Sequence, residues 1–218
     1  MKPENTSHKY SPLDNFITAI DDALRTTFGP APRAFRANPA AGLEESELTE
    51  NEKMLAGQFM RINHAGEVSA QALYQGQALT AKLPNVREKM EQAAAEENDH
   101  LAWTEDRIKE LGTHKSYLNP IWYAGSFTIG ALAGLAGDRW SLGFVVETEK
   151  QVIRHLDEHL AKLSEKDQKS RHILEQMRED EAHHATTALK AGAAAFPVIV
   201  KKAMTFASKI MTRSARWL

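Results

Sequence analysis

EENDHLAW, residues 96–103, places a glutamate three positions before a histidine, and EDEAHHAT, residues 179–186, repeats that spacing. Positions three apart in an α-helix lie side by side on one face of it. No long part of the sequence alternates polar and apolar residues with the period of two that strands show. The two stretches therefore predict helices that carry the same pair of polar side chains.

Capping signals and prolines divide the chain into segments of helical length. Thr49-x-x-Glu52 has the spacing of a capping box, and we expect Ser164-x-x-Asp167 to cap a later helix in the same way. The helices are expected over about 12–28, 50–82, 85–111, 120–163 (one broken helix or two), 164–190, and from 197 onward. Four long helices with short connections predict an all-α, antiparallel four-helix bundle with additional N- and C-terminal helices.

The composition is that of one globular domain, because 42% of the 218 residues are hydrophobic and 26% are charged. We expect residues 1–47 to form an N-terminal extension with a short helix and residues 48–218 to form the bundle domain. The net charge of −2 argues against nucleic acid as a partner. The absence of cysteine excludes disulfides and thiolate metal sites. The start, MKPENTSHKY, has the pattern of neither a secretory signal nor a presequence, so a cytoplasmic location is expected.

The helical period separates the acids of the first motif into two faces. Glu97 shares its face with Met90 and Leu101 and has His100 beside it, so we expect Glu97 and His100 to point inward. Glu96 shares its face with Gln92 and Asp99, and that polar face is expected to look outward.

The same analysis selects one pair from the second motif. Glu181 lies on the face of Leu174 and Met177 and has His184 as its i+3 neighbour, whereas the face of His183 is polar. Glu181 and His184 are therefore the expected inward pair, and Asp180 is not part of it.

Two further helices each offer one inward acid without a histidine. Glu149 lines up with valine, isoleucine and leucine, while Glu147 lines up with Lys150 and Arg154 and is expected on a solvated face. Glu67, within RINHAGEVSA, has a less apolar face, and the pattern alone supports it least of the four.

The inward acids repeat along the chain. Glu67 and Glu97 are 30 residues apart (97 − 67), and Glu149 and Glu181 are 32 apart (181 − 149). Each half is thus a helix with one inward glutamate followed by a helix with Glu-x-x-His. Four buried carboxylates need compensating charge, which two divalent cations would supply. Carboxylates with two imidazoles suit iron or manganese better than zinc, and this ligand set is that of di-iron carboxylate bundles.

A single Glu-x-x-His is usually a surface pair, but two copies on apolar faces, each following another inward glutamate, favour a metal site. His155 lies six residues after Glu149 and either orients a ligand or is an ordinary interfacial histidine. His8, His114 and His172 lie in predicted loops or on polar faces and are expected in solvent.

Four segments in order resemble the demethoxyubiquinone hydroxylases of ubiquinone biosynthesis: INHAGEVSA (62–70), EENDHLAW (96–103), ETEKQVIRHL (147–156) and EDEAHHATTAL (179–189). HAGE is the most specific of these motifs, and the resemblance covers roughly residues 48–218. It implies a ferritin-like fold and a set of iron ligands: Glu67, Glu97, His100, Glu149, Glu181 and His184. It also implies a role near the iron for His155, although Leu156 stands where some relatives have tyrosine.

The activity implied by the resemblance is that of a monooxygenase. Two iron ions would use O2 to place one oxygen atom on the ring of a polyprenyl methoxy-methyl-benzoquinol, in the penultimate step of ubiquinone biosynthesis. Electrons would come ultimately from NADH, and other proteins of the same pathway are possible partners.

Two segments offer a way to reach such a membrane-dissolved substrate. Residues 121–137 carry no charge and include four glycines, which suits either a buried bundle helix or a surface that dips into lipid. Residues 196–218 interleave basic and apolar side chains without an acid, as interfacial helices do, or alternatively pack on the bundle. We expect peripheral attachment at the cytoplasmic face of the bacterial inner membrane.

Two other functions fit part of the pattern. An iron-storage or peroxide-reducing protein related to ferritin or rubrerythrin would keep the metal site without a quinol. A metal-free, membrane-associated helical scaffold would use the glutamates and histidines as buried ion pairs.

Overall fold

A computed structural model describes residues 12–31, 34–45 and 47–218, and within these it contains seven α-helices and no strand. His8 and the side chains of Leu13 and Phe16 lie outside the described part. The helices are α1 (Pro12–Phe28), α2 (Glu50–Thr80), α3 (Pro84–Glu110), α4 (Asn119–Ala136), α5 (Asp138–Lys162), α6 (Gln168–Lys190) and α7 (Val198–Ala215).

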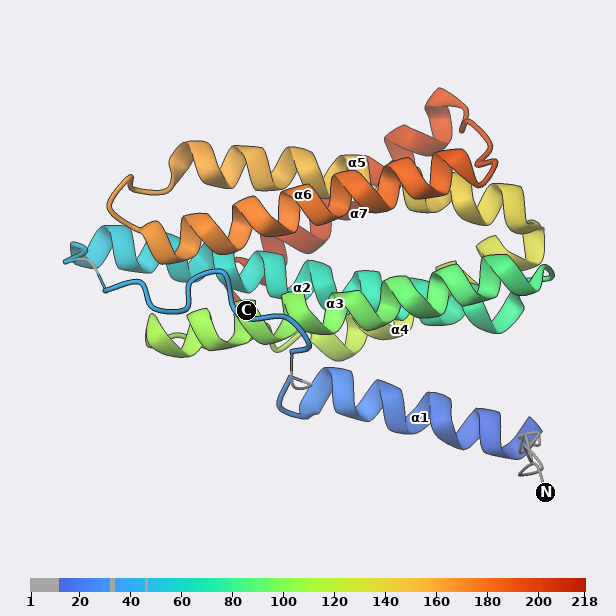
Figure 1. The fold of residues 1–218 in the computed structure, drawn as a ribbon, viewed down its shortest axis with the longest axis horizontal. Coiled ribbons are helices and arrows are strands. Elements are labelled where there is room, and N and C mark those ends of the chain that lie inside the picture. Colours follow the sequence, from blue (N-terminus) through green and yellow to red (C-terminus); the bar gives the residue numbers. More distant parts are fainter. Residues whose placement is uncertain (1–11, 32–33, 46) are drawn as a thin grey trace, which may run out of the picture.

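The bundle consists of two helical hairpins, α2 with α3 and α5 with α6 (Figure 1). Short connections make the two helices of each hairpin antiparallel, and α3 lies beside α6 while α2 lies beside α5. The predicted all-α, ferritin-like four-helix bundle with added terminal helices is confirmed. The additional helix α4 joins the two hairpins and packs mainly against α2.

Local capping follows the sequence at one helix and departs from it at another. The capping box at Thr49 and Glu52 is formed. The predicted cap at Ser164 is wrong, because Asp167 is the N-cap of α6 and its Oδ1 accepts from the Ser170 amide at 3.1 Å. Ser164 instead belongs to the turn before the helix, where its hydroxyl oxygen accepts from the Lys166 amide. A true cap needs the side chain at the first helical turn, and the turn shifts that position by three residues.

The segment 120–163 is two helices, with the break at Gly137. Its φ of 120° lies in a region that L side chains rarely adopt, so the glycine allows the chain to leave the helical conformation between α4 and α5. Asp138 then accepts hydrogen bonds from the amides of Lys82 and Leu83, which fixes this corner against the α2–α3 connection.

Helix α4 lies against α2 through glycine. A Cβ added to Gly130 would lie 2.2 Å from the Leu73 carbonyl oxygen, and one added to Gly76 would lie 2.3 Å from the Phe127 carbonyl oxygen. Such distances leave no room for any side chain, so the two backbones touch. Several larger apolar side chains of α4 nevertheless face outward: those of Ile121, Leu132 and Leu135 are at least 60% exposed, whereas Tyr123 is buried. Of the two alternatives for residues 121–137, the fully buried bundle helix does not hold.

Replacing Gly130 by alanine should force α4 away from α2 and lower the free energy of unfolding by roughly 1–3 kcal/mol, the cost of overpacking a tight contact. Gly125→Ala in the same helix is the matched control, because nothing lies within 4 Å of its added Cβ. The control should be neutral or stabilising by up to about 1 kcal/mol through helix propensity. Urea denaturation of both variants measures the difference, and equal effects would rule out a tight α2–α4 contact.

Candidate metal centre

All four bundle helices contribute to one buried polar cluster. Glu67 comes from α2 and Glu149 from α5, while the two Glu-x-x-His pairs come from α3 and α6. No member of the set is more than 7% exposed. The six residues predicted from the sequence thus lie together: Glu67, Glu97, His100, Glu149, Glu181 and His184.

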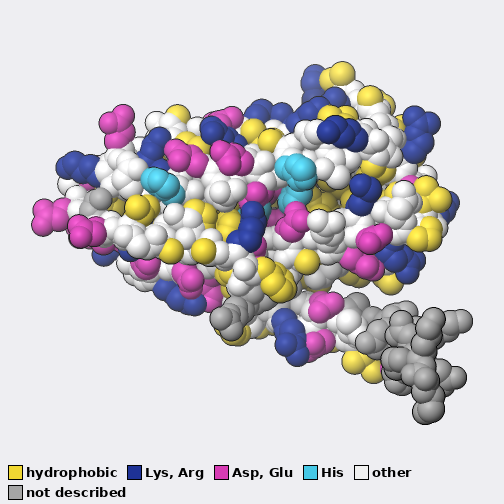
Figure 2. Space-filling model, in the orientation of Figure 1, with side chains coloured by type: hydrophobic (Ala, Val, Ile, Leu, Met, Phe, Trp, Pro, Cys, Tyr) yellow, Lys and Arg dark blue, Asp and Glu magenta, His cyan; other side chains and the backbone are white. Residues whose placement is uncertain are grey.

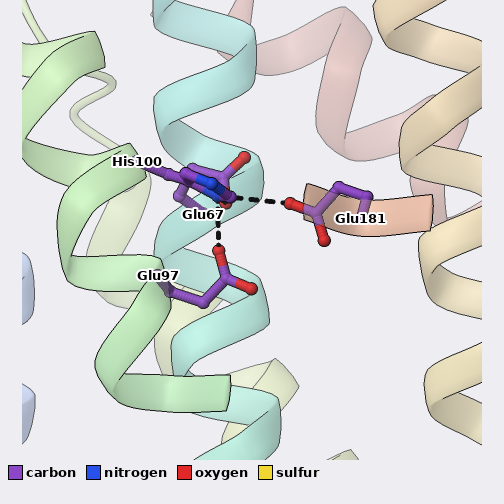
Figure 3. Close-up of side chains that lie close together, drawn as sticks. All are labelled: Glu67, Glu97, His100 and Glu181. Atoms are coloured by element: carbon purple, nitrogen blue, oxygen red, sulfur yellow. Dashed lines mark hydrogen bonds and ion pairs between the residues drawn. The ribbon is translucent and has the colours of Figure 1, made fainter. Parts of the chain in front are cut away.

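The cluster divides into two groups that share one residue. Glu67, Glu97, His100 and Glu181 form the first group, and Glu149, Glu181 and His184 form the second. Within each group the potential ligand atoms lie within 4.8 Å of one another. Figure 3 shows the first group, in which Glu181 reaches across from α6 to the residues of α2 and α3.

The two histidines present the same nitrogen to the cluster. Nδ1 of His100 lies 2.9 Å from Glu97 Oε2 and 3.2 Å from Glu181 Oε1. Nδ1 of His184 lies 3.0 Å from Glu181 Oε2 and 3.6 Å from Glu97 Oε1. Glu181 therefore lies between the two imidazoles with one oxygen toward each.

The other nitrogen of each histidine is held by an acid of the opposite helix. His100 Nε2 lies 2.9 Å from Asp180 Oδ2, and His184 Nε2 lies 2.6 Å from Glu96 Oε2. The prediction that Glu96 simply looks outward is wrong, since it is partly exposed yet reaches His184. Sequence reasoning likewise missed Asp180. A signal was present, because an acid immediately precedes the inward glutamate in both motifs.

Burial and mutual repulsion set the electrostatics of the carboxyl groups. Burial raises the pKa of Glu97 and of Glu149 well above the usual range, and the charge of Glu181 raises both further. Glu181 behaves oppositely: burial alone would raise its pKa, but hydrogen bonds with His100 and His184 lower it to about 2. For His184 the same interaction overcomes burial and raises the pKa to about 9. Keeping Glu97 and Glu149 ionised in this buried cluster therefore needs a positive counterpart.

Unsatisfied oxygens indicate what that counterpart is. Oε1 of Glu97 and Oε2 of Glu149 are buried and have no hydrogen-bond partner within the described residues, although Tyr74 donates to the other oxygen of Glu149. Leaving a buried acceptor unpaired costs about 1–3 kcal/mol, more when it is charged. Metal ions bound to these oxygens would remove that cost. The residues present therefore fit two divalent cations with oxygen and imidazole ligands.

Comparison with known proteins agrees with this geometry. The sequence model of the family described as ubiquinone biosynthesis protein COQ7 matches residues 54–215. The chain belongs to the COQ7 family. A protein of Nitrosococcus oceani named 3-demethoxyubiquinol 3-hydroxylase is 59% identical over 210 residues, which is 96% of this chain and 98% of that protein. Proteins of the same name from Acinetobacter baumannii and Nitrosomonas europaea are 56% and 55% identical, over 96% and 94% of this chain and 99% of each relative.

The other histidines in the described part of this COQ7 family member lie outside the cluster. His155 is partly buried and makes no hydrogen bond to any of the six residues within the described part of the chain. It lines an apolar chamber next to Glu67 instead. His64 and His159 are buried, which lowers the pKa of each to about 3 and keeps them neutral. His114 and His172 make hydrogen bonds to backbone carbonyls and are exposed, as predicted.

Glu147 corrects another prediction from helical faces. It is 7% exposed rather than solvated, because α7 covers it and places Lys201 Nζ 3.7 Å from its Oε2. Asp99, grouped with Glu96 as outward, is also buried, against the N-terminal segment.

Divalent metal should raise the melting temperature of this protein, because a ligand that binds the folded state stabilises it. At a concentration 100-fold above Kd, one site would add roughly 5–10 °C for a chain of this size. Glu181→Gln should abolish most of that increase, since Glu181 belongs to both groups. Glu179→Gln, on the exposed face of the same helix, is the matched control and should keep it. Thermal melts with Co2+ and with chelator measure the increase, and an unchanged increase in Glu181→Gln would rule out this site.

Proposed function

We propose that this chain is a 3-demethoxyubiquinol 3-hydroxylase of ubiquinone biosynthesis, with two iron ions held by Glu67, Glu97, His100, Glu149, Glu181 and His184. The names of the relatives support the reaction. The observation that carries it for this chain is an apolar chamber whose wall includes one of the cluster carboxylates, Glu67. Residues 48–218 carry the site, and residues 1–47 extend the bundle.

The chamber lies between α2, α4, α5 and α7 and has a volume of about 610 Å³. Apolar side chains such as Leu73, Phe144 and Met204 dominate its wall. A volume of this size is that of a small-molecule site, and an apolar lining favours an aromatic ring with a hydrocarbon tail over a polar metabolite. Glu67 brings the ring within reach of the metal cluster, while the lining excludes water from the reacting carbon.

Two side chains of the chamber wall carry a buried nitrogen donor that is unpaired within the described part of the chain. Nδ2 of Asn63 and Nε1 of Trp122 belong to side chains in its wall and have no hydrogen-bond partner among the described residues. Oδ1 of Asn63 lies 3.1 Å from Nδ1 of His159, whose lowered pKa keeps it a neutral donor. That bond orients the amide and fixes the direction of its buried NH2 group.

The chemistry of the reaction divides between the metal and the protein. The ring C–H becomes C–OH as O2, two electrons and two protons also yield one water. Bound iron would supply the activation of O2, with electrons coming ultimately from NADH. The chain's own side chains hold the ring against Glu67 and keep the site dry. His155, in the same wall, is a candidate for moving protons to that site.

We also propose peripheral attachment to the cytoplasmic face of the bacterial inner membrane. Helices α4 and α7 flank the chamber and expose large apolar side chains, among them Ile121, Ile199 and Phe206 at 62%, 73% and 67%. Figure 2 shows basic and hydrophobic side chains side by side where Figure 1 draws the C-terminal segment in red. Such a surface binds anionic lipid, and the quinol could enter from it. Within the described residues, no helix has the length and apolar character needed to cross a bilayer.

The two alternative functions are not favoured. Iron storage does not call for an apolar chamber beside the cluster, and the relatives that cover nearly the whole chain are named as hydroxylases. A metal-free scaffold would leave the buried oxygens of Glu97 and Glu149 unpaired.

The quinone profile of cells that lack this gene tests the function. They should accumulate the demethoxy intermediate, and the wild-type copy should restore ubiquinone while Glu97→Ala restores less than about 1% of the rate, as expected when a metal ligand is lost. Glu88→Ala, on the exposed face of α3, should restore it fully. A normal profile in the deletion strain would contradict the assignment.

Gly66, the glycine of HAGE, should determine whether the ring fits. It lines the chamber beside Glu67, and a Cβ added to it would meet nothing within 4 Å. Gly66→Leu should therefore fold well, gain about 0.5–1 kcal/mol of helix propensity, and obstruct the chamber. We expect KM for the quinol to rise roughly tenfold or more, with Gly66→Ala intermediate. Steady-state kinetics on both variants test this, with iron content as the control, and an unchanged KM would place the ring elsewhere.

A further inference from the structure

The N-terminal segment reaches the metal cluster through one arginine. Residues 34–45 run along the bundle surface between α1 and α2 (Figure 1). From this segment Arg36 Nε lies 2.6 Å from Asp99 Oδ2, and its Nη1 and Nη2 lie 3.0 Å and 2.9 Å from Oδ1 and Oδ2 of Asp180. The guanidinium carbon also lies 4.8 Å from the centre of the Trp103 ring. One side chain thus joins the extension to both α3 and α6.

Because Arg36 binds Asp180 but not Glu96, the carboxylate beside His100 is fixed more firmly than the carboxylate beside His184. Asp180, the partner of His100 Nε2, is bound at both oxygens by Arg36 and also accepts from Gln176 at 3.1 Å. Glu96, the partner of His184 Nε2, has a side chain that is 38% exposed, and among the described residues its one further donor is Gln92, at 2.8 Å. A fork-shaped, two-oxygen ion pair fixes a carboxylate in place, whereas an exposed acid keeps rotamer freedom.

We infer that Arg36 is a positioning residue, which holds His100 through Asp180 and makes the group of Glu67, Glu97, His100 and Glu181 the tighter of the two metal positions. This inference rests on the proposed metal centre. An acid that orients the free nitrogen of a ligating imidazole typically changes metal affinity by 10–100-fold. Arg36 is suited to that task because its planar fork matches a carboxylate, which the single ammonium of lysine cannot do.

The backbone around Arg36 supports a fixed rather than a chance contact. The Phe35 amide donates to Asp99 Oδ1 at 2.6 Å, and Asp99 is 2% exposed. Nearby, the Ala31 amide donates to Glu105 at 2.9 Å, and Lys115 bonds both Gly29 O and Glu105 at 3.0 Å. The segment is therefore attached to α3 both at Ala31 and at Phe35, independently of Asp180.

Titration of the full-length, metal-free protein with Co2+ tests the inference, with the visible absorption of bound cobalt as the signal. The wild type should bind two ions in two steps of different affinity. Arg36→Gln should weaken the tighter step by up to about 10-fold, because it acts through Asp180, and change the weaker step less than about twofold. Glu96→Gln should weaken the other step. Arg25→Gln, which removes an exposed pair with Asp21, is the matched control and should change neither.

Arg36→Lys distinguishes two roles of Arg36: orienting Asp180 and His100, and attaching the N-terminal segment to the bundle. It retains the positive charge near Asp99 and Asp180 but loses the fork, so a positioning role predicts a weakened tight step at an unchanged melting temperature of the metal-free protein. A lowered melting temperature with both binding steps intact in Arg36→Gln or Arg36→Lys would mean that Arg36 only docks the segment, and would overturn the inference. Absence of cobalt binding by the wild type would instead overturn the metal centre itself.

Discussion

Four carboxylates and two imidazoles packed into the core of a helical bundle are the constraint on which the rest of this structure depends. Such a cluster is strongly unfavourable unless positive charge and hydrogen bonds compensate it, so the surrounding helices cannot shift independently. Two buried hydrophobic clusters fix the helices relative to one another. Met60, Trp103 and Met177 belong to one buried hydrophobic cluster, and Met90 and Val145 belong to another. Along α3 and along α6, the inward glutamate comes between residues of one hydrophobic cluster and residues of the other. Burial of these apolar side chains offsets the cost of burying the charged groups.

Five of the six cluster residues could be predicted because each is defined within its own helix, whereas Glu67 depended on the resemblance of RINHAGEVSA to a known family. A side chain three or four positions from leucine or methionine shares their face, whatever the rest of the chain does. The same rule failed where a second element decides the environment. Glu147 is buried because α7 covers it, and Glu96 and Asp180 reach histidines of the opposite helix. Arg36 had no signal at all, since an irregular segment has no period from which a facing direction can be inferred.

Helix α4 shows a different limit of sequence patterns. Its residues are apolar all round, so a hydrophobic face cannot be distinguished by polarity. Side-chain size carries the information instead. Gly130 and Gly134 are buried against α2, while Ile129 and Leu132 are 44% and 60% exposed. This inverts the usual arrangement of a surface helix. It makes physical sense where the partner is a backbone that must be approached closely and the outer surface meets something apolar.

The two kinds of helix lie on opposite sides of the cluster: α3 and α6, which carry Glu-x-x-His, form one side, and α2 and α5, which carry a single glutamate, form the other. Helices α3 and α6 supply both histidines, and the outward nitrogens of these histidines bind acids that continue to the surface and to Arg36. Helices α2 and α5 supply glutamates only, and with α4 and α7 they line the apolar chamber. A histidine on the chamber side would need a polar partner for its second nitrogen inside an apolar wall. Placing the two cluster histidines on α3 and α6 therefore keeps their hydrogen-bond partners on one side and leaves His155 of α5 as the histidine among the residues described in the chamber wall.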